Sequence, residues 1–129
     1  AEDWPGREQV LAALRAAGIA LPDPDDLDAG FRADIGITGV VGAIAETGSM
    51  VLASGDRRRR LASLAVPVHI GVVRADQIVP DLLDWWAAAP ADLPASSVLV
   101  SGPSKTADIE LTLVMGVHGP RVEHVIVVG

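Results

Sequence analysis

The sequence predicts an α/β fold built around a mostly parallel sheet. Half of the 129 residues are apolar but only 3% are aromatic, so the core must consist mainly of Val, Ile, Leu and Ala. Such a core is typical of strands that are buried on both faces by helices. The chain also alternates short apolar runs with helix-length segments, which is the order of elements in an α/β domain. Its length fits a single domain.

Residues 1–18 are predicted to form an N-terminal amphipathic helix of about three turns. Its apolar residues fall on one stripe: Val10, Leu11, Leu14 and Ala17. Gly18 can end this helix, because glycine accepts the left-handed conformation found at helix ends. Residues 19–32 follow as an acidic, proline-rich loop or linker, for which we expect little internal order.

Strands are predicted to begin immediately after this linker. Residues 32–38 form a short first strand. Residues 43–47 and 49–53 form either a hairpin or one bulged strand, and Gly48 at positive φ is compatible with both.

A further strand is predicted at 66–73, followed by a helix at 79–89. Pro67 restricts the beginning of that strand to a sheet edge or to the first strand position, because proline has no N–H to donate. We expect Trp85 of the helix to be half exposed. The buried stripe of the helix is predicted to contain Val79, Leu82, Leu83 and Trp86.

The stretch 97–128 is predicted to form one βαβ unit, the element of parallel sheets. Apolar runs at 97–100 and 124–128 flank a segment that is compatible with a helix. In open parallel sheets, ligands bind beyond the carboxyl ends of the strands, where a loop leads into a helix. Here that loop is 101–106, and it contains Lys105, the only lysine of the chain.

The loop 101–106 is a candidate anion site. A helix amino terminus presents unpaired amides and a partial positive charge, and Ser104 and Thr106 add hydroxyl donors beside the charge of Lys105. It is not a Walker A loop, because that motif needs glycine directly before the lysine. Asp108 could instead satisfy the helix dipole itself. A capped turn that binds nothing is therefore an equally open interpretation.

The residues around Glu46 are a second candidate. This carboxylate lies between small residues on a strand that breaks at Gly48, and a carboxylate so placed can act as a nucleophile or general base. Its neighbours Thr47 and Ser49 would then contact the ligand. The competing interpretation, which the residues alone favour, is an ion pair between Glu46 and an arginine on a hairpin surface.

The histidines do not form a metal-binding pattern. There is no HExxH, HxH or Cys/His pairing, so no metal site is predicted. His118 lies between two glycines and is the histidine best placed for a polar or catalytic role, whereas His69, in the middle of a strand, is interpreted as a hydrogen-bonded core residue. The arginines 57–60 are interpreted as a solvated loop, or alternatively as a contact for a phosphate or an acidic partner.

Composition argues against several classes of protein. The net charge of −7 and the pI of about 4.7 argue against nucleic acid as a partner. No apolar run reaches the roughly 18 residues that span a bilayer, and no leader is apparent, so we expect a cytoplasmic protein. Cysteine is absent, which removes disulfides and iron–sulfur ligation by this chain, so no cofactor is expected in it.

Four motifs together resemble the LUD domain family: residues 33–38, 43–52, 67–70 and 101–120. They extend over nearly the whole of residues 33–129, which would be the LUD-like α/β domain. The resemblance implies a three-layer sandwich similar to ribose-5-phosphate isomerases, glucosamine-6-phosphate deaminases and CoA transferases. Family members usually have more sequence between the first helix and the first motif, so part of the first half of the domain is unaccounted for here.

The resemblance also implies a function. It implies a non-redox component of a system that oxidises L-lactate to pyruvate, alongside iron–sulfur or FAD-bearing subunits. The alternative is a free-standing enzyme or binding protein for a phosphorylated or CoA-linked metabolite. CoA transferases use a catalytic glutamate, but the residues around Glu46 do not match closely enough to assign it that role, and whether the chain is an enzyme stays open.

One pocket at the carboxyl ends of the strands is the resulting site prediction. We expect a small anion to bind there. The residues predicted to converge are Glu46, Thr47, Ser49, Ser104, Lys105, Thr106 and His118. Asp108 is predicted as a further ligand-binding residue.

Overall fold

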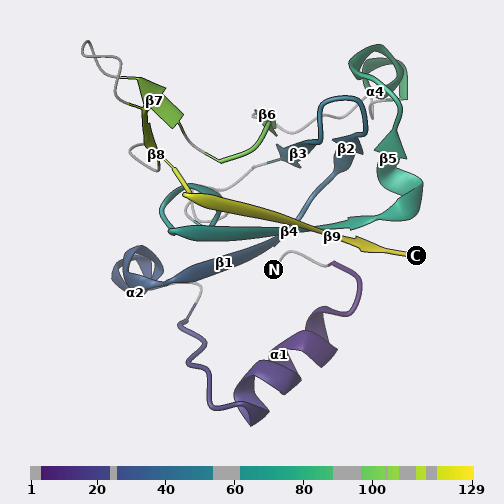
Figure 1. Ribbon diagram of the computed structural model, residues 1–129. Helices are drawn as coiled ribbons and strands as arrows, with labels where there is room; N and C mark the ends of the chain where they lie inside the picture. The colour runs from purple at the N-terminus through teal and green to yellow at the C-terminus, as the bar shows by residue number, and fades with distance from the viewer. Residues whose placement is uncertain are drawn as a thin grey trace.

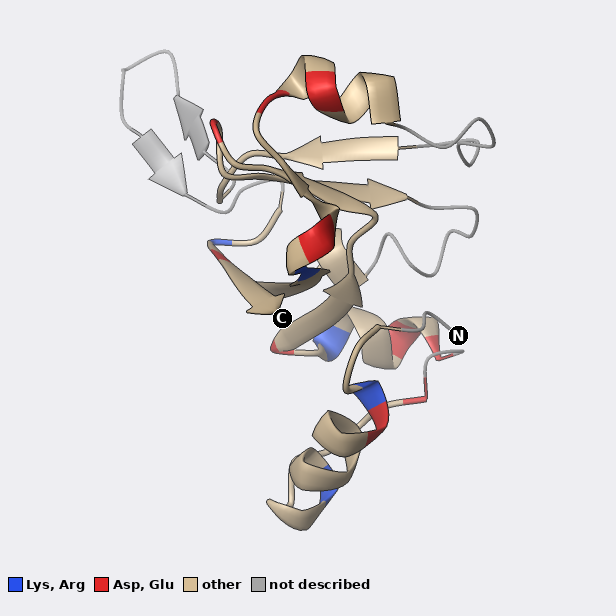
Figure 2. Ribbon diagram, turned by 90° about the vertical axis from the view of Figure 1, so that its right-hand side faces the viewer, with Lys and Arg blue, Asp and Glu red and all other residues tan. Residues whose placement is uncertain are grey.

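The computed structural model describes residues 4–23, 26–53, 62–88, 97–103, 105–107, 113–115 and 119–129, with the backbone alone for 105–107 and 113–115. A three-stranded parallel sheet crosses the middle of the molecule, with a second sheet and helix α4 (Leu82–Ala88) on one side and helix α1 (Arg7–Ala16) on the other (Figure 1). The perpendicular view gives the same order of layers, with acidic residues on both helices (Figure 2). The α/β class is confirmed.

The parallel sheet has the strand order β1-β4-β9. Its strands are β1 (Ile35–Gly39), β4 (Val68–Arg74) and β9 (Val122–Val128). Pro67 lies directly before β4, so its missing N–H costs no ladder hydrogen bond. Its carbonyl oxygen instead accepts hydrogen bonds from the backbone N–H groups of Arg121 and Val122, at 2.8 and 3.2 Å.

The second sheet is mixed and has the order β5-β2-β3-β6. Its strands are β2 (Gly42–Ile44), β3 (Ser49–Ala53), β5 (Ile78–Val79) and β6 (Ser97–Val100), and the turn η1 (Ala75–Gln77) leads from β4 into β5. β2 pairs with β5 in parallel, whereas β3 pairs antiparallel with both β2 and β6. Gly48 has φ 63° in the turn between β2 and β3, so of the two predicted forms the hairpin is the one observed.

The core lies between the two sheets. A Cβ added at Gly71 of β4 would come within 2.2 Å of the Met50 sulfur on β3, so the sheets approach closely where the side chain is missing. The buried apolar residues that pack together here come from both sheets: Val40, Ala43, Met50, Leu52 and Val73. The Val, Ala and Leu core expected from composition is therefore present.

The predicted βαβ unit at 97–128 is wrong. β6 belongs to the mixed sheet and β9 to the parallel sheet, and the segment between them contains two short antiparallel strands, β7 (Lys105–Ala107) and β8 (Leu113–Met115). Residues 105–115 contain Thr106, Ile109, Thr112 and Val114, whose branched Cβ atoms favour a strand over a helix. Compatibility of this segment with a helix was therefore not enough to predict one.

The predicted buried stripe of α4 is also wrong. Trp85 is the buried residue, at 9% exposure, while Leu82, Leu83 and Trp86 are 50–80% exposed. The indole of Trp85 lies against Gly42, where an added Cβ would be 2.6 Å from its Nε1 atom. Because Gly42 leaves room for a large ring, α4 turns Trp85 to the sheet and Leu82, Leu83 and Trp86 to the outside. The fourth residue of the predicted stripe, Val79, lies in β5, is half-buried and packs against the cluster that contains Trp85.

The N-terminal helix forms as predicted but buries none of its ten residues. Gly18 follows it with φ 75°. Before it, Trp4 is buried against Gly39 of β1 and anchors the segment to the parallel sheet.

Within the predicted acidic loop the structure has a short helix, α2 (Leu27–Arg32). The Asp26 carboxylate caps this helix by accepting a 3.0 Å hydrogen bond from the Ala29 N–H.

Candidate functional site

Three hydroxyl side chains meet where the β2–β3 hairpin lies beside the end of β6. The Ser49 Oγ is 2.6 Å from the Thr47 Oγ1 and 2.6 Å from the Ser101 Oγ. The antiparallel register that pairs Met50 with Val100 also brings Ser49 opposite Ser101. We call Thr47, Ser49 and Ser101 the hydroxyl cluster.

Burial differs sharply within the hydroxyl cluster. Ser49 is 1% exposed, whereas Thr47 and Ser101 are exposed. A hydroxyl donates one hydrogen bond and can accept two. Ser49 can donate to only one of its two partners, so the other partner donates to Ser49. One outer hydroxyl is therefore left to donate to a bound anion, and both outer oxygens can still accept from water.

The hydroxyl cluster is suited to binding rather than to nucleophilic catalysis. A serine or threonine nucleophile needs an adjacent base to remove its proton. Among the described side chains, the hydrogen bonds found for these three hydroxyls are to one another, not to a histidine or carboxylate. Gly102 follows with φ 91° and open space around its Cα, so the backbone can come close to a ligand.

Of the predicted site residues, three lie together at this hairpin. Glu46 and Thr47 are in the turn and Ser49 begins β3. The Glu46 side chain is exposed, and its backbone N–H donates a 3.0 Å hydrogen bond to the Pro80 carbonyl. Ser101 lies within the predicted anion loop 101–106 but was not singled out as a ligand-binding residue; its position directly after an apolar strand and before Gly102 is the signal that could have identified it.

The other predicted residues follow Ser101 along the chain. Lys105 and Thr106 are in β7, paired in the ladder with Met115 and Val114, and only their backbone is described. The predictions for Ser104, Asp108, His118 and the arginines 57–60 lie outside the described residues. Because a strand follows the loop, the helix amides expected to attract an anion do not contribute, and hydroxyls remain the donors.

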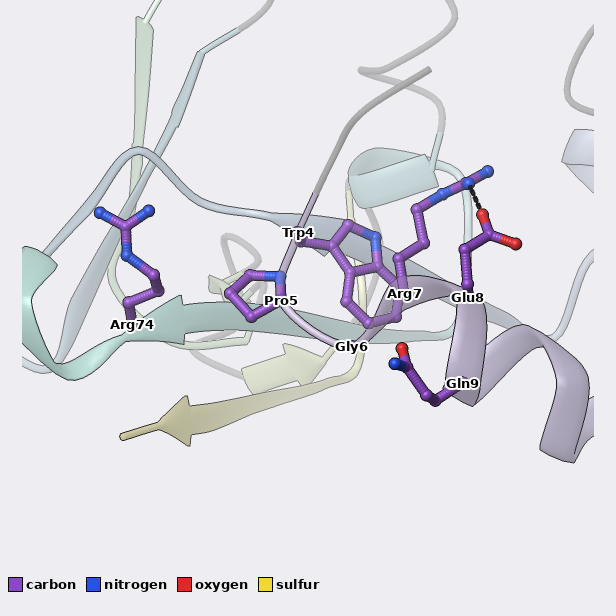
Figure 3. Close-up of a pocket in the computed structure, with 7 residues that line it drawn as sticks. All are labelled: Trp4, Pro5, Gly6, Arg7, Glu8, Gln9 and Arg74. Atoms are coloured by element: carbon purple, nitrogen blue, oxygen red, sulfur yellow. Dashed lines mark hydrogen bonds and ion pairs between the residues drawn. The ribbon is translucent and has the colours of Figure 1, made fainter.

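An open hollow of about 400 Å³ lies beside the start of α1 and forms a second candidate. It is lined by Trp4, Pro5, Gly6, Arg7, Glu8, Gln9 and Arg74, and Figure 3 shows Trp4 and Pro5 between the two arginines. Each guanidinium already has an acidic partner. Arg7 is 2.6 Å from Glu8, and Arg74 donates to both oxygens of Asp76 at 2.9 and 3.3 Å. We therefore expect the hollow to bind an anion more weakly than a site with two unpaired arginines would.

The pKa values of that second ion pair shift as expected for partners. The hydrogen bond from Arg74 lowers the pKa of the Asp76 carboxyl below its ordinary value. The same hydrogen bond raises the pKa of the Arg74 guanidinium. Both groups are therefore charged and mutually neutralised at neutral pH.

A third group of polar residues is buried in the parallel sheet. The His69 Nε2 is 2.8 Å from the Thr38 Oγ1, and the His69 Nδ1 is 2.6 Å from the Glu123 Oε2. With Glu123 ionised, the imidazole donates from Nδ1 and accepts the Thr38 hydroxyl at Nε2. We call Thr38, His69 and Glu123 the buried cluster.

The buried cluster is part of the core rather than a site. His69 is fully buried and Thr38 is 3% exposed, so no substrate reaches the imidazole. Burial raises the pKa of the Glu123 carboxyl above its ordinary value, and the hydrogen bond from His69 offsets that rise only in part. The interpretation of His69 as a hydrogen-bonded core residue is confirmed. Sequence reasoning did not identify its partners.

No group of three or more His, Asp or Glu residues in the described part of the chain lies close enough to hold a metal ion. Nor is any helix described here both long enough and apolar enough to cross a membrane.

The structure is an α/β domain with a partly exposed hydroxyl cluster. Thr38, His69 and Glu123 are bonded in the order of a catalytic triad, but Thr38 and His69 are buried in the core. The LUD domain model matches residues 6–128, and the chain belongs to the LUD domain family. The recognition of that family from the four motifs is confirmed.

Several curated relatives share more than 30% of aligned residues with this chain. "Lactate utilization protein C" of Deinococcus radiodurans is 48% identical over 101 residues, covering 76% of this chain and 48% of the relative. "Lactate utilization protein C" of Halalkalibacterium halodurans is 41% identical over 120 residues, which cover 88% of this chain and 50% of the relative. This chain thus spans about half the length of the curated relatives it matches.

A solved structure, that of a DUF162 family protein from Deinococcus radiodurans, is also similar. It is 35% identical, with a TM-score of 0.49, and the match covers 78% of this chain and 56% of that one.

Proposed function

We propose that this chain acts in L-lactate utilization, as a component that carries no redox centre of its own. The observation that carries the proposal is the family match over residues 6–128 together with relatives named lactate utilization protein C at up to 48% identity. Membership of a family restricts the role but does not by itself assign a reaction, since one fold hosts many chemistries.

We further propose that the hydroxyl cluster and Lys105 bind a small anion, such as the carboxylate of lactate or pyruvate. The buried Ser49 fixes the two exposed hydroxyls, and since each hydroxyl has one hydrogen, one outer hydroxyl is left to donate to the anion. Lys105 begins β7, four residues after Ser101, and would add the charge that neutral donors lack. A charge-assisted hydrogen bond is stronger than a neutral one, so the lysine would provide much of the affinity.

The electron-transfer partners are proposed to be separate subunits that hold iron–sulfur clusters and FAD. Oxidation of a hydroxy acid to a keto acid releases two electrons, and this chain has no cysteine to ligate a cluster. A gentle anaerobic pull-down of the tagged chain should return an iron–sulfur protein in stoichiometric amount.

Growth tests the pathway assignment. Deletion of the gene should abolish growth on L-lactate as sole carbon source and leave growth on pyruvate unchanged. Growth on lactate at the normal rate would reject the assignment. It would favour instead a free-standing protein for a phosphorylated or CoA-linked metabolite, which the hydroxyl donors could also serve.

Binding tests the site separately. Lys105→Ala should weaken binding of L-lactate or pyruvate, measured by calorimetry, by roughly ten- to a hundredfold, since a hydrogen bond to a charged group contributes about 1.5–3 kcal/mol. The melting temperature should barely change. Arg15→Ala, on α1 far along the chain, is the matched control for the loss of one positive charge. Normal affinity in Lys105→Ala would reject the site and leave the pathway assignment intact.

A further inference from the structure

One face of the parallel sheet is mainly apolar and partly uncovered. Residues on this face lie on the same side as Gly39, against which Trp4 packs, and opposite to Gly71, which faces the mixed sheet. His124 and Arg74 are polar residues on this side. The strand register places its apolar members in rows across all three strands: Ile35, Ile37, Val68, Ile70, Val72, Val122, Ile126 and Val128. We call these residues the α1-side face.

Exposure is high where a parallel sheet would normally be covered. Ile35 is 53% exposed, Val122 40% and Ile126 48%, whereas Val72, near Trp4, is 4% exposed. Parallel sheets occur almost only with both faces covered. Trp4 therefore covers one end of the α1-side face. Ile37, Val68 and Ile70 are half-buried, and Ile35, Val122 and Ile126 are exposed.

The helix that could cover this face is already on the correct side. Figure 1 shows α1 below the parallel sheet, opposite to the mixed sheet. None of the residues of α1 is buried, and Leu11 and Leu14 of its apolar stripe are only half-buried. Two complementary apolar surfaces of one chain thus lie near each other, and neither is fully covered.

Length and connection also match. The ten residues of α1 extend about 15 Å at 1.5 Å per residue, close to the roughly 16 Å of the five residues of β1. Trp4 anchors the beginning of the helix at the Gly39 end of β1, and the chain returns to the Ile35 end after the helix. A helix lying antiparallel to β1 satisfies both connections.

Each end of α1 has a glycine at which the backbone can redirect the helix. Gly6 has φ 77° and Gly18 has φ 75°, and neither has another heavy atom near the position of a Cβ. Glycine occupies both halves of φ space at little cost, so the backbone at these two positions can change direction without the strain that a side chain would impose.

We infer that α1 is a strap that closes over the α1-side face, pivoting at Gly6 and Gly18 while Trp4 stays in place. The open arrangement leaves the aliphatic face available to another protein, and the closed one covers it. A second copy of the chain supplying its own α1 is the rival occupant, and the test below separates the two.

Cross-linking tests closure directly, because the chain has no native cysteine. The variant pair Leu14→Cys and Ile37→Cys puts one thiol on the apolar stripe and one on the face. The control pair Ala12→Cys and Ile37→Cys puts the first thiol on the opposite side of the helix. A short bis-maleimide should link the test pair within one chain about tenfold faster than the control, because burying a leucine stripe shifts an equilibrium by at least that factor.

Two outcomes of this experiment would overturn the inference. Equal rates for the two pairs would mean that the stripe never faces the sheet. A dimeric cross-linked product from the test pair would assign the face to a second copy.

Hydrogen exchange covers the case in which a cysteine pair does not fold. In the unmodified sequence, the amides of residues 7–16 should exchange about tenfold more slowly than in Leu14→Glu, since the closed helix is withdrawn from solvent. Ala12→Glu, which adds the same charge on the outer side, should leave the rate near that of the unmodified chain. The same rate in all three proteins would overturn the strap.

Discussion

The buried cluster and the hydroxyl cluster have the same number of side chains and hydrogen bonds but differ in their exposure to solvent. Each joins three side chains by two short hydrogen bonds, at 2.6–2.8 Å. The buried cluster contains two titratable groups, His69 and Glu123, with almost no access to water. The hydroxyl cluster contains none and ends in two exposed groups.

This difference determines what each cluster can do. A buried polar group without a partner pays its full desolvation cost, so the buried cluster contributes to stability and is closed to ligands. An exposed hydroxyl can exchange a protein partner for water or a ligand at little cost. Polar residues should therefore affect folding in the first cluster and binding in the second.

His69→Ala should have the largest effect. It leaves Thr38 and Glu123 without their shared partner, at about 1–3 kcal/mol for each of the two groups, so the free energy of unfolding should fall by at least about 2 kcal/mol. Urea denaturation measures this change. His124→Ala, at an exposed neighbour on β9, should change it by less than about 0.5 kcal/mol. Equal effects of the two substitutions would contradict the structural role of the buried cluster.

Gly36→Ala tests the packing next to the buried cluster, since Gly36 pairs with His69 across the sheet. An added Cβ would lie 1.8 Å from the backbone oxygen of Ala62, so something must shift. Overpacking of this kind costs about 1–3 kcal/mol, which calorimetry would record as a lower melting temperature. Gly30→Ala in α2 meets open space and should be neutral or slightly stabilising.

Ser49→Ala should cost only about 1 kcal/mol of stability, because Thr47 and Ser101 are exposed and can bond to water instead. Its effect should appear in binding, since the outer hydroxyls lose the group that positions them. Calorimetric titration with pyruvate should show weaker affinity than in Ser97→Ala, an exposed serine in the same sheet. A large loss of stability without a binding defect would reverse the assignment of this cluster.

Glu123→Gln should produce the smallest effect, one that depends on pH. Burial raises the pKa of this carboxyl in the folded state above its unfolded value. The stabilisation linked to that shift is fully present below the unfolded pKa and is lost as pH rises through the folded pKa. The free energy of unfolding of the unmodified chain, relative to Glu123→Gln, should therefore decrease as pH increases across that range. A difference that is constant with pH would argue that the carboxyl titrates alike in both states.

The sequence predicted the strands of the parallel sheet well because their apolar content is decisive. β1, β4 and β9 each lie within or close to a predicted run, and Gly48 marked the hairpin. The segment 105–115 was predicted to be helical and instead contains β7 and β8. Its sequence is compatible with a helix, but the branched side chains of Thr and Val prefer a strand. Periodicity cannot separate the two in so short a segment.

Side-chain partners were beyond the reach of the sequence. Ser49 meets Ser101 across 52 positions, and His69 meets Glu123 across 54, by a register that only the folded sheets establish. The prediction that Trp86 rather than Trp85 is buried in α4 failed for a similar reason. The space beside Gly42, which only the folded sheet creates, decides which tryptophan is buried. Glu46, Thr47 and Ser49 were predictable as a group because they are adjacent in the chain.

The long separation between β4 and β9 also has a consequence during synthesis. β4 is the central strand of the parallel sheet, yet one of its two neighbours is added only after some fifty further residues have been made. Until then, the imidazole of His69 lacks its carboxylate and one edge of β4 is unpaired. Contacts between distant positions form slowly and leave apolar strands exposed meanwhile. The nascent chain should therefore depend on chaperones until β9 emerges from the ribosome.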